Sequence, residues 1–353
     1  MTIIYFLILL SVIICLHEAG HLIAAKIFGV YCYEYSFGMG PLLWHKKKKE
    51  TQYSIRAIPI GGYVSMAGET DGDEMYPDVE VPEDRRLINK PWWQRIIILL
   101  AGVTMNFLLA WLLFSIILLV QGAYAESPPA VVGSVREDSP AELAGFQAGD
   151  IILEISKEDG ESIKPKTFMD MQTFYTDDTM EVTYTVERNG QVLDLKVTPK
   201  YSEEEGTYLI GISSGDVVVR EVNILNCWYY GAKEFKDITV LMGRVISNLF
   251  HGRGLDQLSG PVGIYQATET SASMGLLSFL FLMAEISLNV GIFNLLPLPV
   301  LDGGQVVITL AECISGHKLD NKIKTGLFLI CWILLIALML FATWNDIMRL
   351  IAG

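Results

Sequence analysis

An uncharged N-terminal run that leads into His17-Glu18-Ala19-Gly20-His21 is the feature that most limits how this chain can fold. Residues 3–16 contain no charged side chain. About 20 apolar residues make a helix long enough to cross a bilayer. Two histidines four residues apart share one helix face, and ionisable groups are costly in hydrocarbon unless they have a function. The pattern predicts a zinc site on a membrane-spanning helix.

Two alternatives exist for this segment. A soluble amphipathic helix can carry the same spacing by chance. A cleaved signal peptide also has an apolar core, but no basic segment precedes this run and no small-residue cleavage site follows it. Zinc binds neutral imidazole, and two histidines with one further protein ligand leave a position for water. We therefore expect a third ligand elsewhere in the chain.

The composition favours a membrane protein with a soluble insert. The chain has 353 residues, of which 51% are hydrophobic and only 19% charged, which is too apolar for an ordinary soluble enzyme. Besides the first run, three stretches carry at most one charged residue: 96–125, 274–301 and 325–344. We predict a polytopic α-helical membrane protein with four transmembrane helices, a membrane-associated β-hairpin or sheet, and an inserted α+β domain.

The charges are unevenly distributed along the chain. The net charge is −14, and residues 121–275 hold 24 acidic and 12 basic side chains, so this insert carries most of the excess. Lysine and arginine gather between the first and second spans and between the third and fourth, which places those loops in the cytoplasm and the insert outside. No basic and aromatic pattern indicates nucleic-acid binding. The five cysteines show no paired spacing, so we expect neither a disulfide framework nor a cysteine metal site.

The segment after the first span predicts β-structure. Residues 53–64 alternate apolar and polar side chains around Gly61-Gly62, which is typical of strands. A sheet edge beside the membrane site could bind an extended substrate strand, or the sheet could merely close the helix bundle. Residues 76–89 are acidic and contain proline, which predicts a loose surface segment.

The insert has the order of elements of a small α+β domain. We expect a strand at 129–135, a short helix at 139–145, a turn and strand at 148–155, and a hairpin formed by 180–187 and 192–199. This order, and the run Ser139 to Ile155 in particular, resembles a bacterial PDZ domain, present once. Such a domain could bind peptide ends in its groove or act as a gate over the membrane site. Residues 228–250 predict an amphipathic helix that lies on the membrane or packs against this domain.

A carboxylate follows a broken helix at the end of the third span. Pro297 and Pro299 interrupt the helix, and Asp302 precedes two glycines. Broken helices at membrane depth are tolerated where they line a cavity. An aspartate at a helix end is commonly a cap, but combined with the histidine pair Asp302 becomes the candidate third zinc ligand.

Six motifs in order along the chain resemble the site-2 protease family (M50-type), and most closely the bacterial RseP-like regulated intramembrane zinc metalloproteases. They are His17-Glu18-x-x-His21, Phe37-Gly38-Met39-Gly40, Gly61-Gly62-Tyr63-Val64, Ala101-Gly102-x-x-x-Asn106-Phe107, 258–264, and Asn294-x-x-Pro297-x-Pro299-x-Leu301-Asp302-Gly303-Gly304. The chain departs from the family in having one PDZ domain rather than two, Glu285 within a span, and Val103 where proline is common.

The resemblance implies a function and a set of site residues. His17, His21 and Asp302 would bind Zn2+, Glu18 would be the general base, and the substrate would contact Asn294, Gly61, Gly62 and Tyr63. The implied substrates are single-pass membrane proteins already cleaved by another protease, such as anti-sigma factors or remnant signal peptides, in a bacterial cell (inner) membrane. The alternative from another class of protein is a non-catalytic membrane PDZ adaptor with a structural metal site. In such a site a fourth protein ligand would occupy the remaining coordination position of the metal.

These interpretations divide the chain into eight segments. We predict the first transmembrane helix at 1–27, a cytoplasmic-side β-region at 28–94, the second helix at 95–122, the PDZ domain at 123–202, a linker with the amphipathic helix at 203–273, the third helix with Asp302 at 274–304, a cytoplasmic loop at 305–324, and the fourth helix at 325–345.

Overall fold

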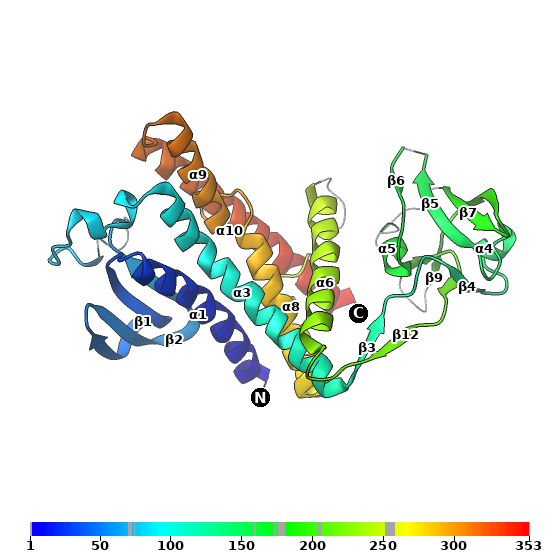
Figure 1. Ribbon diagram of the computed structural model, residues 1–353, viewed down its shortest axis with the longest axis horizontal. Helices are drawn as coiled ribbons and strands as arrows, with labels where there is room; N and C mark the ends of the chain where they lie inside the picture. Colours follow the sequence, from blue (N-terminus) through cyan, green and yellow to red (C-terminus); the bar gives the residue numbers. More distant parts are fainter. Residues whose placement is uncertain are drawn as a thin grey trace. The chain divides into compact units, whose positions relative to one another are not determined.

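The computed structural model describes residues 2–69, 73, 75–158, 160–172, 174, 181–202, 207–250 and 258–352. Four of the described helices are long and apolar enough to cross a membrane: α1 (Thr2–Ile27), α3 (Trp92–Gln121), α8 (Leu276–Asn294) and α10 (Asn321–Ala352) (Figure 1). The four predicted spans are thus confirmed, and the chain is a multi-pass membrane protein. It divides into two units, described separately: a membrane unit (1–117, 231–239 and 256–353) and an insert unit (118–230 and 240–255).

A long β-hairpin packs against the first helix of the membrane unit. Strands β1 (Cys32–Lys48) and β2 (Thr51–Met66) pair with each other, and β2 contacts α1 extensively. Residues 34–37 of β1 pair with both 52–55 and 62–65 of β2, so 62–65 form an outer edge. The Ser11 hydroxyl donates to the Pro59 carbonyl and the Tyr35 hydroxyl to the Cys15 carbonyl, both at 2.8 Å. These bonds tie the hairpin to α1 and confirm the predicted β-region.

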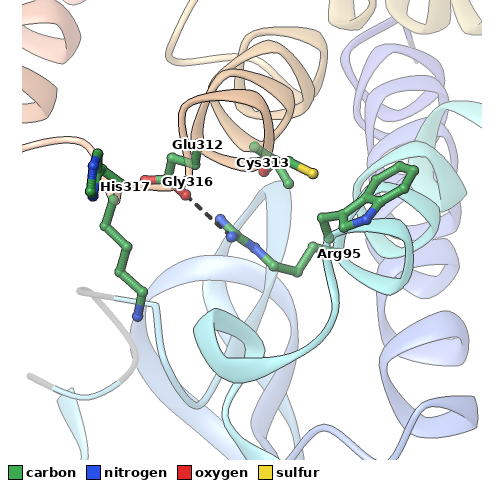
Figure 2. Close-up of a pocket in the computed structure, with 8 residues that line it drawn as sticks. Arg95, Glu312, Cys313, Gly316 and His317 are labelled. Atoms are coloured by element: carbon green, nitrogen blue, oxygen red, sulfur yellow. Dashed lines mark hydrogen bonds and ion pairs between the residues drawn. The ribbon is translucent and has the colours of Figure 1, made fainter.

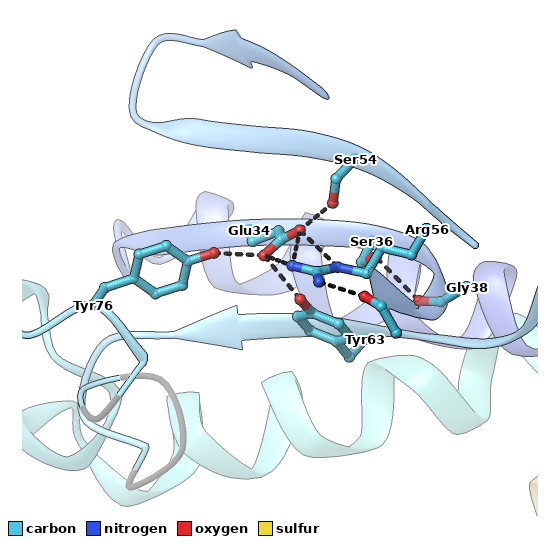
Figure 3. A network of polar contacts seen from close by, with 8 residues as sticks. Glu34, Ser36, Gly38, Ser54, Arg56, Tyr63 and Tyr76 are labelled. Atoms are coloured by element: carbon cyan, nitrogen blue, oxygen red, sulfur yellow. Dashed lines mark hydrogen bonds and ion pairs between the residues drawn. The ribbon is translucent and has the colours of Figure 1, made fainter. Parts of the chain in front are cut away.

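A buried carboxylate organises the hairpin (Figure 3). Glu34 is fully buried and accepts hydrogen bonds from Arg56, Tyr63, Tyr76 and Ser54. Burial alone would raise the pKa of Glu34, but the bonds from Ser54, Tyr76, Tyr63 and Arg56 together hold that pKa below its ordinary value. The carboxylate therefore stays charged and pins both strands to the following segment.

That following segment is more ordered than expected. The Tyr76 hydroxyl binds Glu34, while Val81 and Leu87 are buried. Two 3-10 turns, Glu83–Arg85 and Leu87–Asn89, shape it. The prediction of a loose surface segment at 76–89 was wrong, because acidic and proline-rich composition did not reveal these long-range contacts.

The third span ends at Asn294, and a short turn leads into a further helix. Helix α9 (Asp302–Ser315) begins at Asp302, with Leu301 as its N-cap residue in extended conformation. It occupies much of the predicted loop at 305–324, so the loop prediction was wrong there. Its buried residues are Gly303, Gly304, Ile308, Thr309 and Glu312. Helix α7 (Pro261–Met274) contacts α1, α8 and α10.

The insert unit is built from short antiparallel strands. A four-stranded sheet has the order β6-β5-β7-β8, and β3 pairs with β12 and β4 with β11. The elements are β3 (Ala123–Glu126), β4 (Val132–Val135), α4 (Pro140–Leu143), β5 (Ile151–Lys157), β6 (Ser162–Ile163), α5 (Phe168–Gln172), β7 (Val182–Arg188), β8 (Gln191–Val197), β9 (Lys200–Ser202), β10 (Thr207–Leu209), β11 (Ile212–Ser214) and β12 (Val218–Glu221). Strands β11 and β12 lie within the predicted linker, so the folded insert extends beyond residue 202.

Local chemistry explains the insert's turns and core. Asn189 and Gly190 both have positive φ, 52° and 79°, which suits the tight β7–β8 hairpin. The core includes Phe146, Ile155 and Tyr184. The predicted strand start at Met180 lies outside the described residues. The elements expected at 129–135, 139–145, 148–155 and 192–199 are present in shortened form.

The predicted amphipathic helix is α6 (Cys227–Phe250). Its residues 231–239 belong to the membrane unit, where Phe235 packs edge-on against Phe107 of α3, with 5.6 Å between ring centroids. Glu234 also lies near enough to Glu285 of α8 for their charges to interact. Its second half belongs to the insert unit, where Arg244 pairs with Asp170 of α5 at 2.6 Å. Helix α6 therefore packs against protein along both halves.

Candidate metal centre

Three predicted ligands from two distant segments converge in the membrane unit. His17 and His21 are buried on α1, and Asp302 is the first residue of α9. The His17 Nε2 atom lies 3.2 Å from Asp302 Oδ2 and 3.2 Å from His21 Nε2. The His21 Nε2 atom lies 3.6 Å from the same Oδ2. The structure thus brings together residues that lie 281 positions apart.

These separations suit a tetrahedral zinc ion. Zinc–nitrogen and zinc–oxygen bonds of about 2.0–2.1 Å place neighbouring tetrahedral ligands about 3.3 Å apart. The three observed separations bracket that value. Asp302 Oδ2 is buried without a hydrogen-bond partner among the described residues, although each histidine presents a ring nitrogen to it. The donor set therefore fits zinc, and within the described residues the group has three members, one fewer than a tetrahedral site needs.

The other ring nitrogen of each histidine contacts helix α3. His21 Nδ1 lies 2.8 Å from the Ile98 carbonyl, which can only accept, so this nitrogen carries a proton and Nε2 is the ring atom available to a metal. His17 Nδ1 lies 3.2 Å from Asn106 Nδ2, and Asn106 is fully buried. Neither contact was predicted. Asn106 was visible only as part of a family motif, and a backbone carbonyl leaves no sequence signal.

Glycines allow the close approach that the centre requires. A Cβ atom at Gly102 of α3 would lie 2.4 Å from His21 Nε2, and one at Gly20 of α1 would lie 2.3 Å from the Ala101 carbonyl oxygen. A Cβ at Gly304 would lie 2.0 Å from the Leu298 carbonyl oxygen. Because any larger residue would collide with backbone or ligand, these glycines let α1, α3 and the turn before α9 meet at the histidines.

Glu18 points from α1 toward the hairpin edge. Its Oε2 atom accepts a hydrogen bond of 3.1 Å from the backbone N–H of Val64. Val64 belongs to the outer edge of the hairpin, which pairs with β1 on its other side. The candidate base therefore lies at a strand edge, on the same turns of α1 that carry the two histidines.

The structure places the predicted substrate contacts in two locations. Gly61, Gly62 and Tyr63 precede Val64 on β2. A Cβ at Gly62 would lie 2.6 Å from the Ser36 carbonyl oxygen, and the Tyr63 hydroxyl donates to Glu34, so both have structural roles as well. Asn294 is half-buried at the last position of α8. Their contact with substrate stays a prediction.

The membrane helices and the histidine–aspartate cluster define the class of protein as a membrane zinc metalloprotease. The model of peptidase family M50 matches residues 5–338. The chain belongs to this family. It is 31% identical to the Regulator of sigma-W protease RasP of Bacillus subtilis, over 99% of both chains, and 29% identical to Zinc metalloprotease RasP of Shouchella clausii, again over 99% of both.

Two solved structures each match about a quarter of this chain. One is the PDZ domain of an SdrC-like protein from Listeria monocytogenes, 22% identical over 26% of this chain and 92% of that one, with a TM-score of 0.21. The other is the second domain of the listeria protein Lin2157, 28% identical over 26% and 87% of the two chains, also with a TM-score of 0.21.

Proposed function

We propose that this chain is an intramembrane endopeptidase that cuts transmembrane segments of single-pass membrane proteins. The observation that carries the proposal is the convergence of His17, His21 and Asp302 beside Glu18, on a helix that crosses the membrane. A cluster of three protein ligands supports catalysis over the adaptor alternative, because a structural zinc site is usually filled by four.

His17, His21 and Asp302 would hold the zinc ion, and Glu18 would act as the general base. When bound, zinc lowers the pKa of a coordinated water and polarises the scissile carbonyl. Glu18 takes the proton of the attacking water and can return it to the leaving amine. The Val64 N–H, which donates to Glu18 Oε2, orients the carboxylate for this transfer.

A substrate helix must unfold locally before hydrolysis, since its backbone groups are hydrogen-bonded within the helix. The outer edge at 62–65 lies at Glu18 and offers backbone groups to an extended strand. We propose that substrate lies along Gly61, Gly62 and Tyr63 and that Asn294 holds its backbone from the other side of the centre.

The biological setting follows from charge and from the relatives. Basic loops between the first and second and between the third and fourth spans favour an orientation with the acidic PDZ-like insert outside the cytoplasm of a bacterial cell. The Bacillus subtilis relative is named a regulator of sigma-W, which supports anti-sigma factors as substrates. The insert would then serve as a gate or filter that admits proteins whose outer domain has been removed.

A paired test separates metal binding from catalysis. The full-length protein, purified in detergent, is analysed for zinc and incubated with a single-pass membrane peptide lacking its outer domain. We expect Glu18→Gln to keep zinc and lose at least about 100-fold in cleavage rate, because the neutral amide of a glutamine side chain cannot take a proton. His21→Ala should lose both. Glu50→Gln, a partly exposed carboxylate of the hairpin turn, is the control and should retain both. Wild-type cleavage by Glu18→Gln would overturn the proposal.

A further inference from the structure

Asn106 is the side chain on α3 that faces the zinc-distal nitrogen of His17. It is fully buried, and its Nδ2 atom lies 3.2 Å from His17 Nδ1. Its Oδ1 atom has no hydrogen-bond partner among the described residues. A buried amide oxygen without a hydrogen-bond partner lowers the stability of the fold by about 1–3 kcal/mol. An asparagine in this position beside a ligand histidine therefore needs an explanation.

The tautomer of His17 supplies that reason. Nε2 is the atom that faces Asp302 and His21, so a metal-binding His17 must carry its proton on Nδ1. A protonated Nδ1 needs an acceptor, as His21 has in the Ile98 carbonyl. An asparagine amide can donate through Nδ2 or, after rotation, accept through Oδ1. It is therefore compatible with either tautomer.

We propose that Asn106 is a positioning residue that accepts the Nδ1 proton of His17 through Oδ1 and so presents the Nε2 lone pair to the metal. This inference rests on the proposed ligand role of His17. Partners of this kind fix ring orientation in metal sites, and their loss typically lowers metal affinity about 10–100-fold. The Ser287 hydroxyl of α8 donates to the backbone carbonyl of Asn106 at 2.9 Å, a bond that does not involve the side-chain amide.

Two substitutions of similar size distinguish this role from packing. Asn106→Leu fills the space without a hydrogen bond, and Asn106→Asp provides an acceptor only. Zinc affinity is measured on the full-length protein by competition with a chromogenic chelator, together with the visible spectrum of the cobalt-substituted form. We expect Asn106→Leu to weaken zinc binding about 10–100-fold and change the cobalt spectrum, and Asn106→Asp to retain most of the affinity.

Ser287→Ala is the matched control, because it removes a buried hydrogen bond to the same residue without touching the amide. It should leave zinc affinity unchanged. Equal affinities of Asn106→Leu and wild type, or an Asn106→Asp variant that folds but binds as weakly as Asn106→Leu, would overturn the inference. A wild-type protein that binds no zinc would instead overturn the proposed function.

An independent observation concerns a pocket of about 280 Å³ at the start of α3 (Figure 2). Its lining includes Trp92, Arg95, Glu312, His317 and Lys318. Glu312 is already compensated: it pairs with Arg95 at 3.2 Å and with Lys324 at 2.6 Å, and it accepts the Leu319 N–H. Burial would raise the pKa of Glu312, but these partners hold it below its ordinary value. The pocket therefore has excess positive charge.

The position of the pocket indicates which kind of anion would bind there. Trp92 and Trp93 are about half exposed at the beginning of a membrane span, where amphipathic aromatic rings sit at headgroup level. Lys318 is exposed and has no carboxylate partner among the described residues. We infer that this pocket binds a phosphate group, supplied by the headgroup of an anionic phospholipid.

The test compares lipid with free phosphate. The full-length protein is reconstituted with phosphatidylcholine alone or with added phosphatidylglycerol, and retained lipid is counted by native mass spectrometry. Lys318→Gln should weaken retention of phosphatidylglycerol about fivefold, the effect of roughly one charge at a lipid surface. Lys322→Gln, an exposed lysine at the start of α10 outside the pocket, should not.

A parallel arm adds inorganic phosphate in detergent without anionic lipid. Thermal stabilisation by phosphate that Lys318→Gln abolishes would support the phosphate site and identify a soluble ligand as its source. Equal lipid retention by wild type and Lys318→Gln, with no response to phosphate, would overturn the inference.

Discussion

Two carboxylates of the membrane unit, Glu34 and Asp302, are built in opposite ways. Glu34 accepts hydrogen bonds from four side chains and has no solvent exposure. Asp302 presents a buried Oδ2 that has no hydrogen-bond partner among the described residues and faces two histidine nitrogens. A carboxylate whose oxygens all accept hydrogen bonds fixes the fold, whereas one that faces two imidazole nitrogens and lacks a hydrogen-bond partner can help to hold a cation.

The neighbours of the two groups differ in the same way. The partners of Glu34 are one guanidinium and three hydroxyl groups, which hold its pKa below the ordinary value despite burial. Burial, and after it the bond to Glu34, raises the pKa of Tyr63 to about 12. Around the metal centre, Gly20 and Gly102 have no side chain, and this lets helices α1 and α3 approach each other closely at the histidines. Stability and chemistry thus depend on different residue types within one unit.

The sharpest way to break the metal centre alone is Gly102→Ala. The new Cβ would lie 2.4 Å from His21 Nε2 and 2.8 Å from His17 Cε1, closer than atoms can approach. One histidine must move, and we expect zinc affinity and proteolysis to fall at least about 100-fold, since loss of ligand geometry exceeds the effect of losing a supporting partner. Zinc content and cleavage rate are the measurements.

Gly326→Ala is the matched control on α10, where an added Cβ meets no atom within 4 Å. It should leave both properties unchanged. If Gly102→Ala binds zinc as wild type does, the close packing of α3 on the histidines is not a requirement.

The complementary substitution, Glu34→Gln, should destabilise the fold and leave the zinc content unchanged. It removes the buried charge that Arg56 pairs with at 3.0 Å and leaves the partly buried guanidinium without its carboxylate. Breaking a buried pair costs about 3–5 kcal/mol, which we expect as a lower free energy of unfolding in detergent. Glu50→Gln, whose pair with Arg85 is partly exposed, should cost less than about 1 kcal/mol. If both variants lose the same free energy of unfolding, burial of Glu34 does not strengthen its ion pair.

Acid should lower the stability of the fold through Glu34, because the pKa of this carboxylate is below its ordinary value in the folded chain. The unfolded chain protonates Glu34 near its ordinary pKa of about 4.3, while the folded chain keeps the charge to lower pH. The unfolded state then binds more protons, so stability falls as the pH drops below that value. Unfolding measured from pH 7 to pH 3 should be steeper for wild type than for Glu34→Gln, and parallel curves would refute this assignment.

The sequence predicted the centre better than its surroundings. His17 and His21 are local neighbours on a helix, and the two prolines before Asp302 marked the break that brings it into position. The Ile98 carbonyl and the Asn106 amide come from another helix, and such contacts leave no spacing pattern. Residues specified by local geometry could be found, and those that depend on packing between helices could not.

The same distinction explains the errors in the fold. Residues 76–89 were expected to be loose because local composition is acidic, yet Tyr76 is held by a carboxylate 42 positions earlier. Most of helix α9 was expected to be a loop because it lies between the third and fourth apolar stretches. Strands β11 and β12 lie beyond the predicted domain end because their partners, β4 and β3, precede them by many residues.

A third carboxylate, Asp346, tests whether saturation always signals a structural role. It is buried on α10, and its Oδ2 atom accepts hydrogen bonds from the backbone N–H groups of Gly260, at 2.9 Å, and Gly263, at 2.8 Å. These bonds cap the first turn of α7, which contacts α1. Asp346→Asn keeps one acceptor oxygen but loses the charge at the helix start, so we expect about 1–2 kcal/mol of destabilisation with unchanged zinc content. If zinc is lost while the helices remain folded, this cap is coupled to the metal centre through α7 and α1, and the division between the two kinds of carboxylate fails.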